Sequence, residues 1–147
     1  MHYNIFWVRI MINYERKAHY HETDQMGVIH HANYLKWMEE ARTDFLDQLG
    51  LTYANIEKLG VISPVTGISI DYKTPVLYNE IVYFNIKIKE YNGVKMTIEY
   101  EIRKKANDDL CVIATSKHCF LKDNRIISMK RELPDYHNIL INHMENN

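Results

Sequence analysis

"HANYLKWMEEARTDFLDQLG", residues 31–50, is the stretch that decides the fold. Placed on a helical wheel at about 100° per residue, its apolar side chains gather on one broad face. That face contains Tyr34, Leu35, Trp37, Met38, Ala41, Phe45, Leu46 and Leu49. Gly50 follows at a position suited to a left-handed helix cap. The stretch therefore predicts a helix of about five turns whose apolar arc is wide enough to be covered by a sheet.

The second half of the chain alternates apolar and polar residues with a period of two, which is typical of half-buried strands. Residues 82–89 and 94–103 show the pattern, and Asn92-Gly93 between them is a strong hairpin signal. Further strands are predicted within residues 67–76, 110–121 and, near the N-terminus, 13–21. Together these elements predict an α+β fold, a five-stranded antiparallel sheet wrapped around one long helix. One helix leaves strand edges uncovered, so we expect pairing with a second chain.

The composition favours one domain over residues 1–147. With 147 residues, 46% of them hydrophobic and 25% charged, the chain can bury one core but not two. We expect residues 1–12 to be a marginal N-terminal extension, residues 52–59 to form a short helix, and residues 132–147 to be a C-terminal segment with helical character.

Charge and cysteine content exclude several partners. Eighteen basic and nineteen acidic residues give a net charge of −1 without long runs of one sign, so we expect no nucleic acid or membrane-surface partner. No apolar run reaches about 18 residues, so no membrane span is expected. Cys111 and Cys119 fall in one predicted strand, roughly 26 Å apart, too far for a disulfide. Free thiols indicate a cytoplasmic protein.

A second stretch, "HETDQMGVIHHANY" at residues 21–34, contains the residues suited to catalysis. The glycine positions exclude a serine-hydrolase elbow and both phosphate-binding loops. Asp24 precedes Gly27, where the backbone can turn and a ligand can approach closely, and His31 stands at the start of the predicted helix. Free N–H groups at a helix N-terminus can polarise a carbonyl, while a carboxylate attacks it or activates water. This chemistry suits a thiolate leaving group, whose conjugate acid has a pKa of about 8.5.

Simpler roles compete at each of these positions. Asp24 could be only a turn former, and Asn33 competes as the helix N-cap. His19 and His21 could bind a metal with Glu22, His30 or His31, but no Cys partner or H-E-x-x-H spacing supports this, so neither metal nor cofactor is expected. Arg42 falls inside the apolar arc, and we expect it to pair with Glu39, its neighbour at i−3.

Residues 20–51, "YHETDQMGVIHHANYLKWMEEARTDFLDQLGL", and 70–80, "IDYKTPVLYNE", closely resemble the 4-hydroxybenzoyl-CoA thioesterase-like (YbgC-type) hotdog-fold acyl-CoA thioesterases. The resemblance reaches about residue 122. It implies the hotdog fold, edge-to-edge homodimers that often assemble as dimers of dimers, and an acyl-CoA or acyl-carrier-protein thioester substrate.

The resemblance also implies roles for individual residues. Asp24 matches the catalytic carboxylate, and His31 the position whose backbone N–H serves the oxyanion and whose side chain, when histidine, is implicated in catalysis. The remaining matches are substrate contacts at Gly27, Val28, Tyr34 and Lys73, the last toward coenzyme A phosphates, and structural support from Glu39 and Arg42. Met26 replaces a common small residue, which implies a narrower acyl pocket, and Asn79-Glu80 replaces a Gly-Asp turn.

The sequence thus predicts an acyl-CoA thioesterase in which two subunits build each site. The first alternative is a hotdog hydroxyacyl-thioester dehydratase or hydratase that uses His31 with Glu40, although that branch's His-Phe-Pro-Gly loop is absent. A non-catalytic acyl-thioester-binding module is the second alternative.

Overall fold

The computed structural model describes residues 11–146, so most of the predicted N-terminal extension lies outside the described residues. The helices are α1 (Ala32–Gln48), α2 (Tyr53–Lys58), α3 (Met129–Glu132) and α4 (Pro134–Glu145), with a 3-10 helix, η1, at Tyr20–Glu22. The long strands are β3 (Val65–Tyr72), β4 (Ile81–Tyr91), β5 (Lys95–Lys104) and β6 (Leu110–Cys119). The short strands are β1 (Glu15–Lys17), β2 (Val61–Ile62), β7 (Leu121–Lys122) and β8 (Arg125–Ile126).

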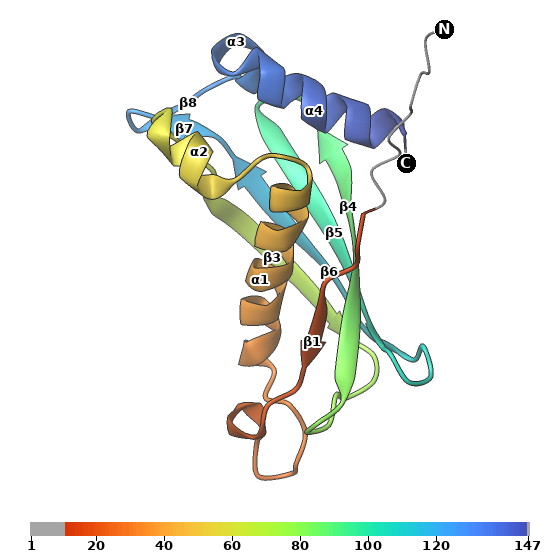
Figure 1. The fold of residues 1–147 in the computed structure, drawn as a ribbon. Coiled ribbons are helices and arrows are strands. Elements are labelled where there is room, and N and C mark those ends of the chain that lie inside the picture. Colours follow the sequence, from red (N-terminus) through yellow and green to blue (C-terminus); the bar gives the residue numbers. More distant parts are fainter. Residues whose placement is uncertain (1–10, 147) are drawn as a thin grey trace, which may run out of the picture.

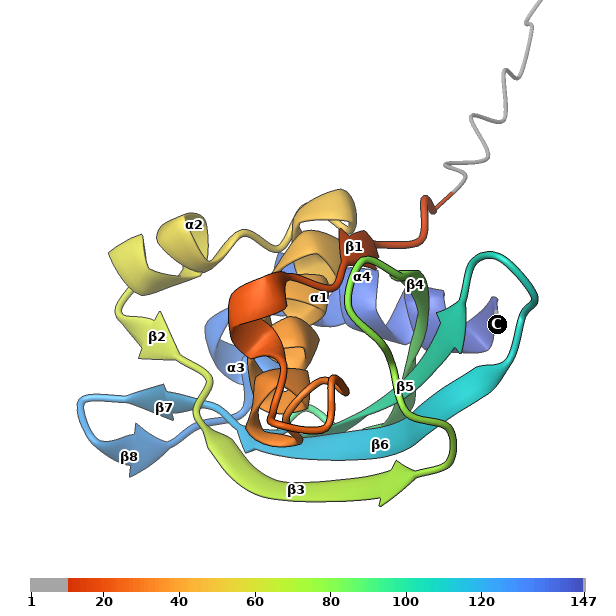
Figure 2. The same cartoon turned by 90° about the horizontal axis from the view of Figure 1, so that it is seen from below.

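The main sheet has the strand order β1-β4-β5-β6-β3 and is antiparallel throughout. It curves around α1, as the view along the helix shows (Figures 1 and 2). The predicted fold is therefore confirmed. The predicted hairpin is present as well: Gly93 has a positive φ, and Oδ1 of Asn92 accepts hydrogen bonds from the amides of Val94 and Lys95.

The core lies between α1 and the concave face of the sheet. From the helix, Trp37, Met38 and Ala41 are almost fully buried, and from the sheet Phe84, Ile98 and Ile102 are as well. Burying each large apolar side chain contributes about 1.5–3 kcal/mol. Leu35 departs from the prediction because 46% of its surface is exposed. The apolar arc of α1 is thus narrower than its composition indicates.

The predicted pair of Glu39 and Arg42 is wrong. Arg42 is buried under the sheet, where its Nε donates to the hydroxyl of Tyr53 at 3.1 Å and its Nη1 to that of Tyr100 at 3.2 Å. Glu39 lies on the exposed side of α1. Three residues apart on a helix, the two side chains differ by about 60° in direction, which lets Arg42 face the sheet while Glu39 faces solvent. Tyrosine hydroxyls satisfy the guanidinium instead.

The outer edge of β3 remains open. β3 pairs with β6 on one side, and none of the strands within residues 11–146 pairs with its other side. Its apolar side chains are partly exposed, including 43% of Ile68. The opposite edge strand is shorter than predicted for residues 13–21, because the chain turns into η1 at Tyr20 after the three residues of β1. In the described part of the chain, no helix is both long and apolar enough to cross a bilayer.

Candidate active site

A tight loop between η1 and α1 holds the predicted catalytic residues. Thr23 and Ile29 form an antiparallel bridge, and the amide of Asp24 donates to the carbonyl of Val28 at 2.8 Å. Gly27 closes the turn with φ +77°, a backbone conformation that favours glycine. The amide of Ile29 then donates to the carbonyl of Val76 at 2.8 Å, which fixes the loop to the segment that follows β3.

The Asp24 carboxylate uses only one of its oxygens within this loop. Oδ1 accepts hydrogen bonds from the amides of Met26 at 2.8 Å and Val28 at 3.3 Å. Oδ2 has no hydrogen-bond partner among residues 11–146, and the side chain is only partly buried. One oxygen therefore holds the turn while the other is available to a ligand. Asp24 therefore forms the turn, as the simpler interpretation predicted, and its Oδ2 can also contact a ligand.

The start of α1 supplies an unpaired donor. His31 is the N-cap residue and makes no side-chain capping bond. Its backbone N–H has no acceptor within the described part of the chain, whereas the next amide, that of Ala32, donates to Nδ1 of His30. Asn33 is not the N-cap, because it lies inside α1, where its side-chain amide donates to the carbonyls of Glu22 and His30. The helix therefore begins with one N–H group free for a ligand.

Asp24 and His31 border one cavity of about 370 Å³ between the loop, the start of α1 and the end of β3. Its volume suits a small-molecule site. The lining residues are Asp24, Val28, Ile29, His31, Tyr34, Tyr72, Lys73, Thr74 and Pro75. The structure thus brings together five of the predicted site residues. Gly27 shapes the adjoining turn without lining the cavity, and Glu39 and Arg42 lie elsewhere.

Tyr72 and Thr74 are wall residues that the sequence did not single out. They flank Lys73, so the one available signal was their position at the end of the strand. The ring of Tyr72 lies against Tyr34 at a centroid distance of 5.5 Å and against His31 at 6.4 Å. Burial raises the pKa of Tyr34 to about 12, so this hydroxyl is neutral and also accepts from the amide of Val76 at 3.4 Å. Tyr34 and Tyr72 therefore form an aromatic wall of the cavity, in which the Tyr34 hydroxyl is uncharged.

Met26 does not narrow this cavity. Its side chain is 84% exposed at the tip of the loop and does not line the cavity. Because the backbone of the turn points the side chain outward, the substitution of a small residue by Met26 leaves the space next to Asp24 unchanged. The predicted narrowing is therefore absent from the cavity within one chain, and for an acyl pocket shared by two copies it stays a prediction.

Glu40 is not available as an acid or base beside His31. Its Oε2 accepts from the hydroxyl of Tyr14 at 2.7 Å and from Nε of Arg16 at 2.8 Å. It also does not border the cavity. The dehydratase alternative thereby loses the acidic partner that it requires.

His19, His21 and Glu22 have potential metal-ligand atoms within 4.8 Å of one another. The Glu22 carboxylate, however, already accepts hydrogen bonds from Arg16, Trp37 and the amide of His19. The guanidinium of Arg16 also places a positive charge where a cation would have to bind. The cluster therefore does not suit a metal ion.

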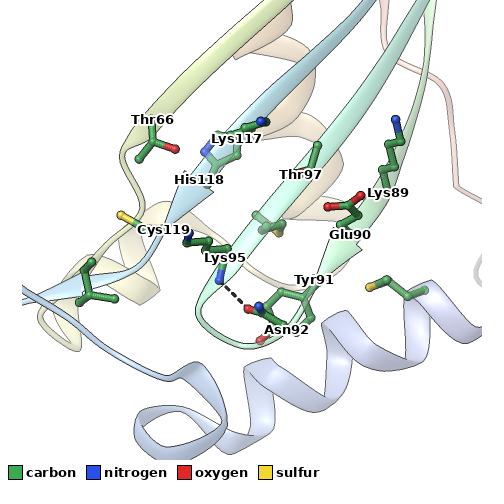
Figure 3. A pocket seen from close by; sticks show the side chains of 13 residues that line it. Thr66, Lys89, Glu90, Tyr91, Asn92, Lys95, Thr97, Lys117, His118 and Cys119 are labelled. Atoms are coloured by element: carbon green, nitrogen blue, oxygen red, sulfur yellow. Dashed lines mark hydrogen bonds between the residues drawn. The ribbon is translucent and has the colours of Figure 1, made fainter.

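A second hollow lies at the other end of the sheet, next to the β4–β5 hairpin. It has a volume of about 740 Å³ and combines an apolar floor with the cations of Lys89, Lys95 and Lys117. Figure 3 shows Lys89 on β4 and Lys117 on β6 on either side of Thr97 of β5. Among the described residues that line it, Glu90 is the one carboxylate. We call this hollow the lysine groove.

The fold and its relatives place the protein in the hotdog class of thioester hydrolases. The chain belongs to the thioesterase-like superfamily, whose family model matches residues 18–135. YneP of Bacillus subtilis (strain 168) is 43% identical over 125 residues, which cover 84% of this chain and 90% of that protein. Acyl-CoA thioesterase YbgC of Helicobacter pylori is 34% identical over 86 residues, 58% of this chain and 62% of that one. The structure of DHNA-CoA thioesterase from Staphylococcus aureus matches with a TM-score of 0.85 at 34% identity, over 90% of each chain.

Proposed function

We propose that the protein hydrolyses acyl-CoA thioesters, with Asp24 as base or nucleophile and the backbone N–H of His31 as oxyanion donor. One observation carries the proposal: an unpaired carboxylate oxygen and an unpaired helix-start N–H belong to residues that line the same cavity. The names of related proteins, YbgC and DHNA-CoA thioesterase, support the substrate class.

The reaction needs few groups because a thiolate leaves without protonation. Either Oδ2 of Asp24 attacks the thioester carbon, or it takes a proton from a water that attacks. The carbonyl oxygen gains negative charge, which the N–H of His31 and the positive end of the α1 dipole stabilise. The carbon–sulfur bond then breaks and coenzyme A thiolate leaves. When water is the nucleophile, the same step yields the free carboxylic acid. In the nucleophilic route, water subsequently hydrolyses the anhydride formed on Asp24.

We further propose that two copies pair through the open edge of β3. Antiparallel pairing of β3 with β3 would place Thr66 of one copy beside Tyr72 of the other. Within one chain these residues are six positions, or about 20 Å, apart. Thr66 lines the lysine groove and Tyr72 the Asp24 cavity. Each cavity would then adjoin the groove of the second copy, whose lysines suit the phosphates of coenzyme A.

Thiol release from a panel of short, medium, long and aromatic acyl-CoA substrates tests the activity, with Asp24→Asn as the matched variant. The proposal requires turnover by the wild type and a loss of at least about 100-fold in the variant. Tight binding of acyl-CoA without any thiol release would overturn it in favour of the binding-module alternative. Turnover that survives in Asp24→Asn would exclude the proposed role of Asp24.

A further inference from the structure

The carboxylate of Glu22 is the most fully engaged polar group near the Asp24 cavity. Only 3% of Glu22 is exposed. Its Oε1 accepts from Nη1 of Arg16 and from the amide of His19, and its Oε2 accepts from Nε1 of Trp37 at 2.8 Å. One side chain therefore connects β1, η1 and the middle of α1.

The backbone carbonyl of the same residue closes the catalytic loop. It accepts hydrogen bonds from the amide of His30 at 2.8 Å and from the side chain of Asn33 at 3.0 Å. Asp24 lies two residues after this carbonyl, and His31 directly follows the amide that binds to it. Both ends of the loop are thus held at Glu22, and neither the carboxylate nor the carbonyl of Glu22 lines the cavity.

The charges around Glu22 stabilise this arrangement. Burial raises the pKa of Glu22, but hydrogen bonds from Arg16, Trp37 and the amide of His19 outweigh it and hold the pKa below its ordinary value. The guanidinium of Arg16 also stacks over the ring of Trp37 at 4.9 Å and forms a second ion pair with Glu40 on α1. A buried carboxylate with three hydrogen bonds is held rigidly.

We propose that Glu22 is a positioning residue that sets the distance between Oδ2 of Asp24 and the N–H of His31. This inference rests on the proposed thioester hydrolysis, in which both groups must meet one carbonyl. The bridge of Thr23 with Ile29 holds the loop internally, but its two ends close at Glu22, so the relative placement of the two groups depends on that closure. Because a misplacement of about 1 Å can lower the rate about 100-fold, loosening Glu22 acts on turnover more than on substrate binding.

Glu22→Gln tests the inference, and Glu40→Gln is the matched control. Both variants remove one of the two ion pairs of Arg16. Among residues 11–146, however, the carboxylate of Glu40 bonds to Arg16 and Tyr14 and to no part of the loop. In Glu22→Gln, a side-chain amide replaces the carboxylate that accepts from the N–H groups of Arg16 and Trp37, so its own NH₂ group opposes one of these donors. We expect kcat to fall about 10- to 100-fold with KM within about threefold, whereas Glu40→Gln keeps the kcat of the wild type.

Hydrogen exchange of the His30 amide provides a readout that does not depend on activity. We expect faster exchange at His30 in Glu22→Gln and unchanged exchange in Glu40→Gln. Equal losses of kcat in the two variants, or an unchanged kcat and a protected His30 amide in Glu22→Gln, would overturn the inference. If the wild type releases no thiol from any substrate, the proposed function fails, while the exchange measurement still decides whether Glu22 holds the loop.

Discussion

The amide of Met26 donates a 2.8 Å hydrogen bond to Oδ1 of Asp24. The loop is therefore held by the same carboxylate that we assign to the chemistry, through its other oxygen. Asparagine can keep an acceptor oxygen at the Oδ1 position, but alanine cannot. Two substitutions at this residue should thus separate its structural role from its catalytic role.

We expect Asp24→Asn to stay within about 1 kcal/mol of the wild type in stability and Asp24→Ala to lose about 1–2 kcal/mol. Alanine leaves the amides of Met26 and Val28 without their acceptor. Both variants should be equally inactive because both lack Oδ2. Urea denaturation and thiol release measure the two effects. An alanine variant as stable as the wild type would show that the Oδ1 bonds do not hold the loop.

Local sequence patterns predicted much of the fold but little of the site's support. The helix of residues 31–50 and the Asn92-Gly93 hairpin depend on neighbours within a few positions, so periodicity and turn chemistry were sufficient. The partner of Arg42 was missed because Tyr100 lies 58 positions away and reaches it only through sheet pairing. Glu22 was missed as a support for the same reason, since its bond to Trp37 joins separate elements.

Gly27 should resist substitution for conformational reasons alone. A Cβ there would meet nothing within 4 Å, but the φ of +77° lies in the left-handed region. We therefore expect Gly27→Ala to lose about 1–2 kcal/mol of stability and Gly27→Asn to lose less. Gly67→Ala is the control, because that glycine lacks a positive φ and a Cβ would make ordinary contact with Lys117. Thermal unfolding measures both, and equal effects at Gly27 and Gly67 would contradict the assignment of strain.

The lysine groove should contribute to binding of the coenzyme A nucleotide. We expect Lys117→Ala to raise KM for an acyl-CoA about two- to fivefold, the effect of one exposed charge, while kcat is unchanged. A matched acyl-pantetheine thioester, which lacks the nucleotide, should show no increase. Lys87→Ala serves as the control, because Lys87 lies outside the groove and pairs with Glu99 at 3.5 Å. A similar KM increase for both substrates would argue against phosphate binding by the groove.

The open edge of β3 gives a test of the proposed dimer. In an antiparallel pair of β3 strands, Ile68 of each copy lies close to the other copy, so Ile68→Lys would bring like charges together. We expect this variant to become monomeric and to lose turnover together with the dimer. Light scattering coupled to size-exclusion chromatography gives the mass. Leu59→Lys, at another exposed apolar position, should change neither property. A dimeric Ile68→Lys protein, or a monomeric wild type, would exclude the β3 interface.

His118 should make the stability of the protein depend on pH. It is 2% exposed, and its Nε2 lies 2.7 Å from the hydroxyl of Ser116, which is in turn 2.6 Å from that of Tyr100. Nη1 of Arg42 donates to the Tyr100 hydroxyl. The Tyr100 hydroxyl therefore donates to that of Ser116, and the Ser116 hydroxyl donates to Nε2 of a neutral His118. Protonation of Nε2 would leave the Ser116 proton without an acceptor. Burial, together with the charge of Arg42, lowers the pKa of His118 to about 4.

A lowered histidine pKa means that the unfolded chain binds the proton more readily than the folded one. The contribution of neutral His118 to the free energy of unfolding is therefore fully present above pH ~6.5. It is lost as the pH falls toward ~4, by about 3 kcal/mol in total. Carboxylates titrate mainly below pH ~5, so the interval from ~6.5 to ~5 reports the histidines. Burial also lowers the pKa of His143, which acts in the same direction, so His143→Gln is measured in parallel. We expect His118→Gln to remove most of the change in urea midpoint with pH over this interval. If the change persists in His118→Gln and disappears in His143→Gln, the effect belongs to His143.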